Sequence, residues 1–332
     1  MKPWIAAYLL ADGALEKVYG ERERASIERL LGSPPLRLIP EDVARPGAAW
    51  PEVELLFSGW GMPRVDAAFL ARFPRLRAIF YGAGSVKVFA TPAMWERGIR
   101  VTTAASANAV PVGDFALSQI LFSLKWGWRN VFSIRAHGCF PQPEDPPGIF
   151  RSVVALLSFG AIGRLVAERL RAFDVRVIGY DPFISDGEMA QLGVERVSLE
   201  EAFECADVVS CHMPLLRQTE RLIGGRHFES MKPGATFLNT ARGGVVDEAS
   251  MIEVLRRRPD LTAVLDVTDP EPPVPGSPLY AMENVILTPH IAGSMGRECE
   301  RMGAMMAEEL ERYMDGRPLL FEIDAERAAS AA

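Results

Sequence analysis

Residues 156–165 read LLSFGAIGRL, an apolar run that passes through a glycine-containing turn into a helix-like segment. The turn matches the dinucleotide-binding pattern G-x-G-x-x-G at its second and third glycines, Gly160 and Gly163. Ser158 occupies the position of the first glycine, which normally serves the tight turn. The stretch therefore predicts either a cofactor site with one altered residue or an ordinary turn between a strand and a helix. The turn alone does not decide between these two alternatives.

Each remaining part of the turn has a physical role in binding a dinucleotide. Gly160 lets the backbone approach a pyrophosphate, and Gly163 lets the helix pack closely on the strand. Ala161 and Ile162 open the helix, where free N–H groups and partial positive charge favour phosphate. Ser158 fits the first position if its backbone stays out of the conformations that only glycine adopts easily.

An acidic residue follows the next predicted strand, VRVIGY. Asp181 lies 18 residues after Gly163, close to the offset of about 20 at which a carboxylate reaches an adenosine ribose. Such a carboxylate accepts hydrogen bonds from both ribose hydroxyls and repels a 2′-phosphate. Residues 182–184 are Pro-Phe-Ile and offer no arginine for that phosphate. The sequence therefore favours NAD(H) over NADP(H).

The chain alternates short apolar runs with helix-like segments from Val153 to His290. The runs are VVALLS, VRVIGY, VVSCHM, ATFLNT, LTAVLDV and NVILTPH. Continuous apolarity is typical of strands buried on both faces of a parallel sheet, and the alternation predicts a doubly wound α/β domain. The first hundred residues show a weaker version, with strand-like WIAAYLL, LRLIP, VELLFSGW and LRAIFYG, and predict a second, smaller α/β domain.

Three further segments complete the predicted organisation. A long helix is expected over roughly 112–131, with Pro111 in its first turn, and the proline-rich segment 137–148 is expected to be an exposed arm or loop. The amphipathic segment GRECERMGAMMAEELERYMDG has no strand pair after it and is expected to pack back on the N-terminal domain. The predicted domains are therefore 1–103 with 292–332, and 104–291 inserted between them.

The composition excludes several classes of protein. The chain has 332 residues, 48% hydrophobic and 24% charged, as expected for a globular protein of two domains. Its net charge of −7 argues against a nucleic-acid partner, and no apolar run approaches the roughly 20 residues that span a bilayer. The four cysteines form no CxxC pair and no zinc-like cluster. We therefore expect no metal site, no membrane partner and a cytoplasmic protein with reduced thiols.

Three downstream stretches contain the candidate chemistry. They are NTARGGVVDE (239–248), LDVTDPEP (265–272) and TPHIAGS (288–294). Arg242, Glu271 and His290 each come shortly after a predicted strand, at the sheet edge where open parallel sheets bind ligands. Arg242 can clamp a carboxylate with two hydrogen bonds, and His290 can exchange a proton near neutral pH. Glu271 can orient His290 and favour its charged form.

These stretches resemble motifs of the D-isomer-specific 2-hydroxyacid dehydrogenases. The family patterns N-x-A-R-G-x-x-V-D, D-V-x-x-x-E-P and T-P-H-x-A-G are matched at 239–247, 266–272 and 288–293. The resemblance implies hydride transfer between NAD(H) and C2 of a 2-hydroxy or 2-oxo acid. It assigns Arg242 as carboxylate clamp, His290 as acid/base and Glu271 as its partner. It also implies a Rossmann NAD-binding domain inserted into a flavodoxin-like substrate-binding domain.

The resemblance implies further contacts with cofactor and substrate. The predicted cofactor contacts, besides the turn from Ser158 to Gly163, are Asp181, His212, Pro214, Thr219, Thr240, Ala241, Asp266, His290 and Gly293. The predicted substrate contacts are Gly84, Ser85, Val86, Asn108, Arg242 and His290.

The substrate loop departs from the family pattern G-A-G-x-D-x-I-D. It reads GAGSVKVF at 82–89, so both acids are absent and Lys87 appears. Lys87 fits either a second negative group on the substrate or an ordinary surface lysine. Trp60, after another predicted strand, is a candidate apolar wall.

Two alternatives to this enzyme remain open. One is an NAD-sensing binding protein, like the corepressors that resemble this family. The other is a related dehydrogenase whose substrate is not a 2-hydroxy acid, for example formate or a phosphonate. Turnover of 2-oxo acids separates both from the predicted enzyme. The resemblance also implies a homodimer joined through the NAD-binding domain, with residues 126–150 as the candidate arm.

Overall fold

The computed structural model describes residues 4–140 and 145–330. These residues form two compact units: Ala109–Gly293 is one, and the chain up to Asn108 and from Ser294 onward is the other. Each unit contains its own mainly parallel β-sheet with helices, so the predicted α/β fold class is confirmed. Residues 141–144 of the predicted arm, and the chain ends at 1–3 and 331–332 of the predicted smaller domain, lie outside the described residues.

The unit formed by Ala109–Gly293 contains a parallel sheet, seven-stranded within the described chain, in the order β12-β11-β10-β9-β6-β7-β8. Its strands are β6 (Val153–Leu157), β7 (Arg176–Tyr180), β8 (Glu195–Arg196), β9 (Val208–Cys211), β10 (Thr236–Asn239), β11 (Thr262–Leu265) and β12 (Val285–Leu287). The six apolar runs all form strands, and β9, β10 and β11 are buried along their whole length, as expected for two covered faces. The sequence did not indicate β8, because this edge strand has two residues and both are exposed.

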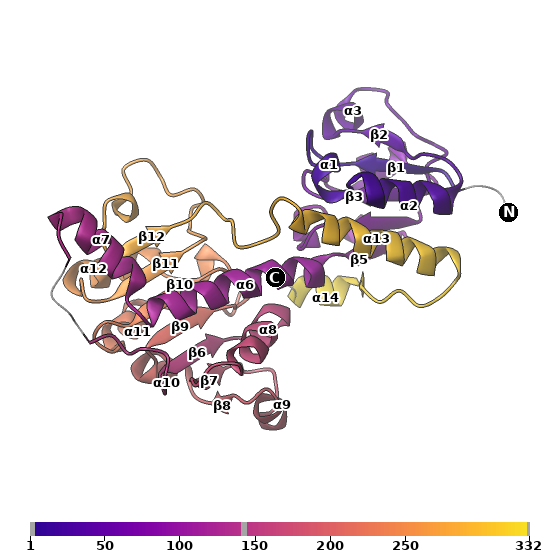
Figure 1. The fold of residues 1–332 in the computed structure, drawn as a ribbon. Coiled ribbons are helices and arrows are strands. Elements are labelled where there is room, and N and C mark those ends of the chain that lie inside the picture. The colour runs from indigo at the N-terminus through magenta and orange to yellow at the C-terminus, as the bar shows by residue number, and fades with distance from the viewer. Residues whose placement is uncertain (1–3, 141–144, 331–332) are drawn as a thin grey trace. The chain divides into compact units, whose positions relative to one another are not determined.

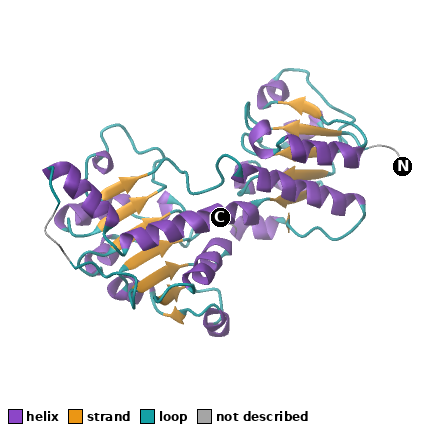
Figure 2. Cartoon of the chain, in the orientation of Figure 1, coloured by secondary structure: helices purple, strands orange, loops and turns teal. Residues whose placement is uncertain are grey.

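Helices flank this sheet (Figure 2). They are α8 (Ala161–Leu170), α9 (Asp186–Gln191), α10 (Leu199–Cys205), α11 (Gly225–Ser230) and α12 (Glu248–Arg257), with single 3-10 turns η2 (Gly243–Val245) and η3 (Pro278–Tyr280). A capping box opens α10, because Ser198 N donates to the Glu201 carboxylate at 2.8 Å and Glu201 N donates to the Ser198 hydroxyl at 3.1 Å. Asp247 caps α12, accepting from Ser250 N at 3.4 Å.

The long helix predicted over 112–131 is in fact two helices. The first, α6 (Ala105–Ser123), starts earlier, so Pro111 lies in its interior rather than in its first turn. Side chains along α6 are buried, and this packing outweighs the backbone N–H that proline lacks, which a sequence pattern does not reveal. The chain then turns at Trp126, whose φ is +49°, and α7 (Gly127–His137) follows.

The other unit has a sheet, six-stranded among the described residues, in the order β13-β5-β4-β3-β1-β2. Its strands are β1 (Ala6–Leu9), β2 (Leu36–Leu38), β3 (Leu55–Ser58), β4 (Ala78–Tyr81), β5 (Arg100–Thr103) and the antiparallel β13 (Glu322–Ile323). Its helices are α1 (Leu15–Val18), α2 (Glu21–Leu31), α3 (Pro40–Ala44), α4 (Ala67–Arg72), α5 (Pro92–Glu96), α13 (Glu298–Met314) and α14 (Ala325–Ser330), with the 3-10 turn η1 (Val86–Val88). The order β2-β1-β3-β4-β5 is that of flavodoxin-like sheets.

Helix α13 lies beside α2, although the two come from opposite ends of the chain (Figure 1). Met302, Met306 and Leu310 of α13 share one buried cluster with Ile27 and Leu31 of α2. The apolar stripe of this C-terminal helix therefore completes the core of a unit that begins at the other end of the sequence. Within the described chain, no helix is both long enough and apolar enough to cross a membrane.

Candidate active site

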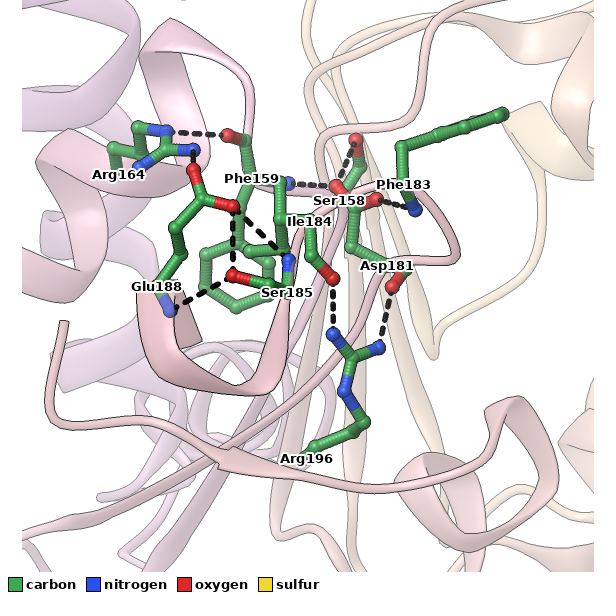
Figure 3. A network of polar contacts seen from close by, with 9 residues as sticks. All are labelled: Ser158, Phe159, Arg164, Asp181, Phe183, Ile184, Ser185, Glu188 and Arg196. Carbon is green, nitrogen blue, oxygen red and sulfur yellow. Dashed lines mark hydrogen bonds and ion pairs between the residues drawn. The ribbon is translucent and has the colours of Figure 1, made fainter. Parts of the chain in front are cut away.

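The glycine-containing turn lies between β6 and α8, with Ser158 at its first position (Figure 3). Ser158 has a φ of +78°, so the expectation that its backbone avoids the left-handed region is wrong. Its amide donates to Tyr180 O at 2.8 Å, and its hydroxyl donates to Asp181 Oδ2 at 3.4 Å. Phe159 N donates to the same carboxylate oxygen at 2.8 Å. These contacts with the neighbouring strand hold a serine in a conformation that favours glycine.

Asp181 is buried at the end of β7 and organises the loop that follows (Figure 3). Its Oδ1 accepts from Phe183 N at 2.8 Å. Arg196, from the edge strand β8, donates to Asp181 O at 2.7 Å and also to Ile184 O, and pairs with Asp186. The sequence offered no arginine at 182–184, and the one that the fold brings to this loop already bonds two carbonyls and a carboxylate. It is therefore not a free binding group for a 2′-phosphate.

The residues around the turn fit a dinucleotide. A Cβ on Gly163 would lie 2.1 Å from Ser158 O, so this glycine is needed for close packing, whereas a Cβ on Gly160 would meet no atom within 4 Å. At the carboxyl ends of β9 and β10, His212 Nδ1 and Thr240 Oγ1 are buried without a hydrogen-bond partner in the described chain. Open space at Gly160 and two buried polar atoms without a partner at the ends of neighbouring strands are expected where a polar ligand binds.

His212 is a buried histidine that packs against the start of α8. Its Nε2 lies 3.0 Å from Ser210 Oγ, and its Cδ2 would be 3.8 Å from a Cβ on Gly163. Burial lowers the pKa of His212 to about 4, so the imidazole is neutral at neutral pH. The ring can therefore pack against a cofactor or hydrogen-bond it without adding charge.

The predicted contacts Pro214 and Thr219 belong to one braced loop after β9. The Thr219 hydroxyl donates to Pro214 O at 2.5 Å and accepts from Leu216 N at 2.8 Å. Thr219 therefore supports the shape of the loop within the protein.

Arg242 is presented by a turn after β10 that Asn239 holds together. Asn239 Oδ1 accepts from Ala241 N at 3.0 Å, and its Nδ2 donates to Arg242 O at 3.0 Å. The guanidinium donates to Ala241 O at 2.6 Å. Burial lowers the pKa of Arg242, and the negative charge of Glu271 opposes that effect. The sequence motif contained Asn239, but its role as the brace of this turn came only from the structure.

The turn of Arg242 touches the loop that carries Glu271. A Cβ on Gly243 would lie 2.0 Å from the carbonyl carbon and oxygen of Thr268, so the two backbones are in direct contact. Asp269 N also donates to the Glu248 carboxylate at 3.1 Å. The sequence did not single out Glu248, because its partner lies 21 residues away.

His290 and Glu271 form the central pair of the site. His290 Nδ1 lies 2.6 Å from Glu271 Oε1, and the two side chains are 50% and 41% exposed, so they remain accessible to a substrate. His290 has a φ of +54°. Its amide donates to Asp266 O at 3.1 Å and to Thr288 O at 3.0 Å.

Asp266 is almost wholly buried and holds the turn of His290 in place. Its Oδ1 accepts from Thr288 Oγ1 at 2.5 Å and from Ile291 N at 2.8 Å, and its Oδ2 accepts from Ala292 N at 2.9 Å. The resemblance predicts that Asp266 contacts the cofactor. In the structure, its three bonds hold the segment that presents His290, and Gly293 directly follows that segment.

The predicted substrate loop follows β4 in the other unit. The Thr103 hydroxyl lies 2.9 Å from Ala83 O and 2.6 Å from Gly84 O, which places the loop backbone, and Val86 is buried at the start of η1. The amide nitrogens of Gly84 and Ser85 donate to no acceptor in the described chain. In the same unit, Asn108 Oδ1 accepts from Ser294 N at 2.8 Å. Two free amides beside a glycine can bind a carboxylate.

The chain is similar to a known family. Residues 133–292 match the family described as D-isomer specific 2-hydroxyacid dehydrogenase, NAD binding domain. An (S)-sulfolactate dehydrogenase from Chromohalobacter salexigens is 34% identical over 256 residues, which cover 76% of this chain and 82% of the relative. A D-3-phosphoglycerate dehydrogenase from Archaeoglobus fulgidus is 30% identical over 269 residues, 77% of this chain and 49% of the relative. The chain thus spans about half the length of that relative.

A solved structure extends the likeness to both units. A crystal structure of a protein from Thermus thermophilus shares 30% identity with a TM-score of 0.74, covering 96% of this chain and 99% of that one. The matched family model covers the unit with the dinucleotide turn, and a relative that is 34% identical covers three quarters of the chain. The cofactor is therefore NAD, and the chain belongs to the D-isomer-specific 2-hydroxyacid dehydrogenase family.

Proposed function

We propose that this chain transfers a hydride between NAD(H) and C2 of a 2-hydroxy or 2-oxo acid. The observation that carries the proposal is the 2.6 Å contact between His290 Nδ1 and Glu271 Oε1, on loops that follow β12 and β11. Arg242 follows β10, the next strand of the same sheet. An acid/base pair and a cation therefore lie along the carboxyl edge of three neighbouring strands, where open parallel sheets bind ligands.

Arg242 is the proposed clamp for the substrate carboxylate. Burial lowers its pKa because a desolvated cation is costly, and a bound carboxylate would offset that cost with two charge-assisted hydrogen bonds. Held in this way, the substrate has its carbonyl oxygen close to the same cation, which favours negative charge on that oxygen as reduction proceeds. NADH supplies the hydride when it is bound.

His290 is the proposed acid and base. Since Nδ1 faces Glu271, Nε2 is the atom that gives a proton to the substrate oxygen in reduction and takes it back in oxidation. The carboxylate of Glu271 stabilises the charged imidazole and fixes the ring orientation. Acid catalysis from a positioned group of this kind contributes about 10²- to 10⁴-fold.

Several finer parts of the proposal rest on the family resemblance. Gly84, Ser85, Val86 and Asn108 are proposed substrate contacts, supported by the free amides of Gly84 and Ser85. The cofactor contacts proposed beyond the turn and Asp181 are His212, Pro214, Thr219, Thr240, Ala241, Asp266, His290 and Gly293. A homodimer in the cytoplasm is also proposed, with the four unpaired cysteines as support for a reducing compartment.

The test is NADH consumption by the purified protein with a panel of 2-oxo acids. The panel contains glyoxylate, hydroxypyruvate and phenylpyruvate, together with sulfopyruvate and 3-phosphohydroxypyruvate, which the names of the relatives suggest. His290→Ala is the catalytic control, and NADH fluorescence measures binding separately. We expect turnover with at least one acid, and His290→Ala should lower kcat by about 10²-fold or more while NADH still binds.

Tight NADH binding without turnover of any acid would contradict the proposal. That result would favour an NAD-sensing protein or a dehydrogenase of a different substrate.

A further inference from the structure

The loop that carries Glu271 has few backbone groups with which to hold itself in place. Three of the six residues from Thr268 to Pro273 are prolines, which lack a backbone N–H. The Thr268 hydroxyl bonds Pro270 O at 2.9 Å within the loop, and Tyr280 bonds Pro273 O at 3.0 Å. The amide of Asp269, two residues before Glu271, is one of the few donors left.

That amide donates to the carboxylate of Glu248 at 3.1 Å. Glu248 is the first residue of α12, a helix fixed by buried Met251, Val254 and Leu255 and by its Asp247 cap. The carboxylate of Glu248 is therefore attached to a rigid helix, whereas its partner, the Asp269 amide, belongs to a loop without regular secondary structure.

Glu248 is partly buried beside the acid loop. Burial raises the pKa of Glu248, and the nearby carboxylate of Asp269 raises it further, while the hydrogen bond from the Asp269 amide lowers it. A carboxylate held next to another acid in a partly desolvated place is not a favourable surface arrangement. The hydrogen bond to the loop is the contact that offsets this cost.

The two loops are also joined at the backbone. Gly243 contacts Thr268 so closely that a Cβ would lie 2.0 Å from its carbonyl, and a Cβ on Gly244 would lie 3.6 Å from Asp269 Oδ2. One segment, from Arg242 to Glu248, thus supports the acid loop at two points, Gly243 and Glu248. The loop supported at these points carries Glu271, whose Oε1 lies 2.6 Å from His290 Nδ1.

We propose that Glu248 is a positioning residue that, through the amide of Asp269, holds Glu271 against His290 Nδ1. It does not touch the reacting atoms and acts through the acid loop. The expected effect of Glu248 on turnover rests on the proposed function, whereas its effect on the His290–Glu271 contact does not.

The first readout is the tautomer of the neutral His290 ring, which is monitored by ¹⁵N NMR of histidine-labelled protein. The chain has four histidines, and His290→Asn identifies the signal of His290. With Glu271 accepting, the neutral ring carries its proton on Nδ1. We expect Glu271→Ala, Glu248→Ala and Glu248→Asp to shift the population toward the Nε2 tautomer, because the last two lose the contact or the reach.

Two variants should leave the tautomer unchanged. Glu248→Gln keeps an oxygen that can accept from the Asp269 amide. Glu253→Ala removes a glutamate of the same helix that is 76% exposed and only pairs with Arg257 at 4.0 Å. In turnover, we expect kcat/KM to fall about 10- to 100-fold in Glu248→Ala, with NADH binding unchanged and near-complete rescue in Glu248→Gln.

The outcomes separate the two claims. A wild-type tautomer in both Glu248→Ala and Glu248→Asp, or no rescue by glutamine, would overturn the positioning role. Absence of turnover in the wild type, with the tautomer shifts as expected, would overturn the proposed function and leave the positioning role intact.

Discussion

At the scale of single residues, Ser158 shows the clearest conflict between side chain and backbone. A φ of +78° costs a residue with a Cβ about 1–2 kcal/mol. The contact with Asp181 (Figure 3) and the hydrogen bond to Tyr180 O hold Ser158 there. The altered glycine position is therefore maintained by its neighbours rather than by its own preference.

We predict that Ser158→Gly is more stable than Ser158→Ala by about 1 kcal/mol. Both variants lose the hydroxyl, but only glycine relieves the left-handed strain. Urea unfolding of the two variants measures the difference. Equal stability would mean that the turn relaxes to a negative φ when alanine replaces serine.

His212 predicts a specific dependence of stability on pH. Its pKa in the folded protein is about 4, below the ordinary value of 6.5, because burial disfavours the charged ring. Between these values the unfolded chain binds the proton and the folded chain does not. The contribution of His212 to the free energy of unfolding is therefore fully present above the pKa of the unfolded chain. It is lost as the pH falls toward the pKa of the folded protein.

From about pH 7 to about pH 5 we expect this histidine to account for a loss of about 2 kcal/mol in the free energy of unfolding. His212→Gln should lose less stability than the wild type over this interval, whereas the exposed His137→Gln should behave like the wild type. Urea titrations at both pH values measure these slopes. A His212→Gln slope equal to that of the wild type would contradict the assignment.

At the scale of elements, the turn after β10 and the loop after β11 are interlocked. A Cβ added at Gly243 would meet the rigid carbonyl of Thr268, whereas a Cβ added at Gly244 would lie 3.2 Å from methyl groups of Leu215, which can move. The same added methyl group thus meets backbone at one position and a flexible side chain at the next.

We predict that Gly243→Ala destabilises the protein by about 1–3 kcal/mol and lowers turnover, because it separates the loops of Arg242 and Glu271. Gly244→Ala is the matched control and should have a clearly smaller effect on both. Thermal unfolding and kcat/KM of the pair give the comparison. Similar values for the two variants would argue against the backbone contact at Gly243.

At the scale of the whole molecule, α7 carries apolar side chains that its own unit covers only in part. Trp128 and Phe132 pack against the core of that unit, but no residue of α7 is fully buried. Phe150, which follows this region, is 65% exposed. Exposed apolar surface of this kind is typical of an interface between protein chains.

We predict a homodimer that uses this surface. Light scattering should give twice the 36.5 kDa chain mass, and Phe150→Asp should shift the protein toward the monomer. Leu36→Asp, at an exposed strand position in the other unit, is the control and should stay dimeric. A wild-type monomer would rule out the predicted assembly.

Much of the molecule could be predicted from local pattern. The six apolar runs of the inserted unit and the four of the other unit all form strands. Burial on both faces explains the continuous apolarity of the central ones, such as β3, β4, β9, β10 and β11, whereas β2 is an exposed edge strand. The positions of Arg242, Glu271 and His290 after β10, β11 and β12 also follow from the sequence, since parallel strands end at one edge. Short or exposed elements such as β8 escaped prediction because they bury too little to leave a pattern.

By itself, then, the sequence determined the fold class, the NAD cofactor and the family, because these depend on periodicity and on motifs within a few residues. Only the tertiary structure decided which carboxylates hold the site together. Asp181 accepts a hydrogen bond from Ser158, Asp266 from the turn of His290, and Glu248 from the loop of Glu271. Each of these contacts joins residues more than 20 positions apart. A carboxylate can accept a hydrogen bond from any amide that the fold brings within reach, so no local sequence pattern predicts its partner.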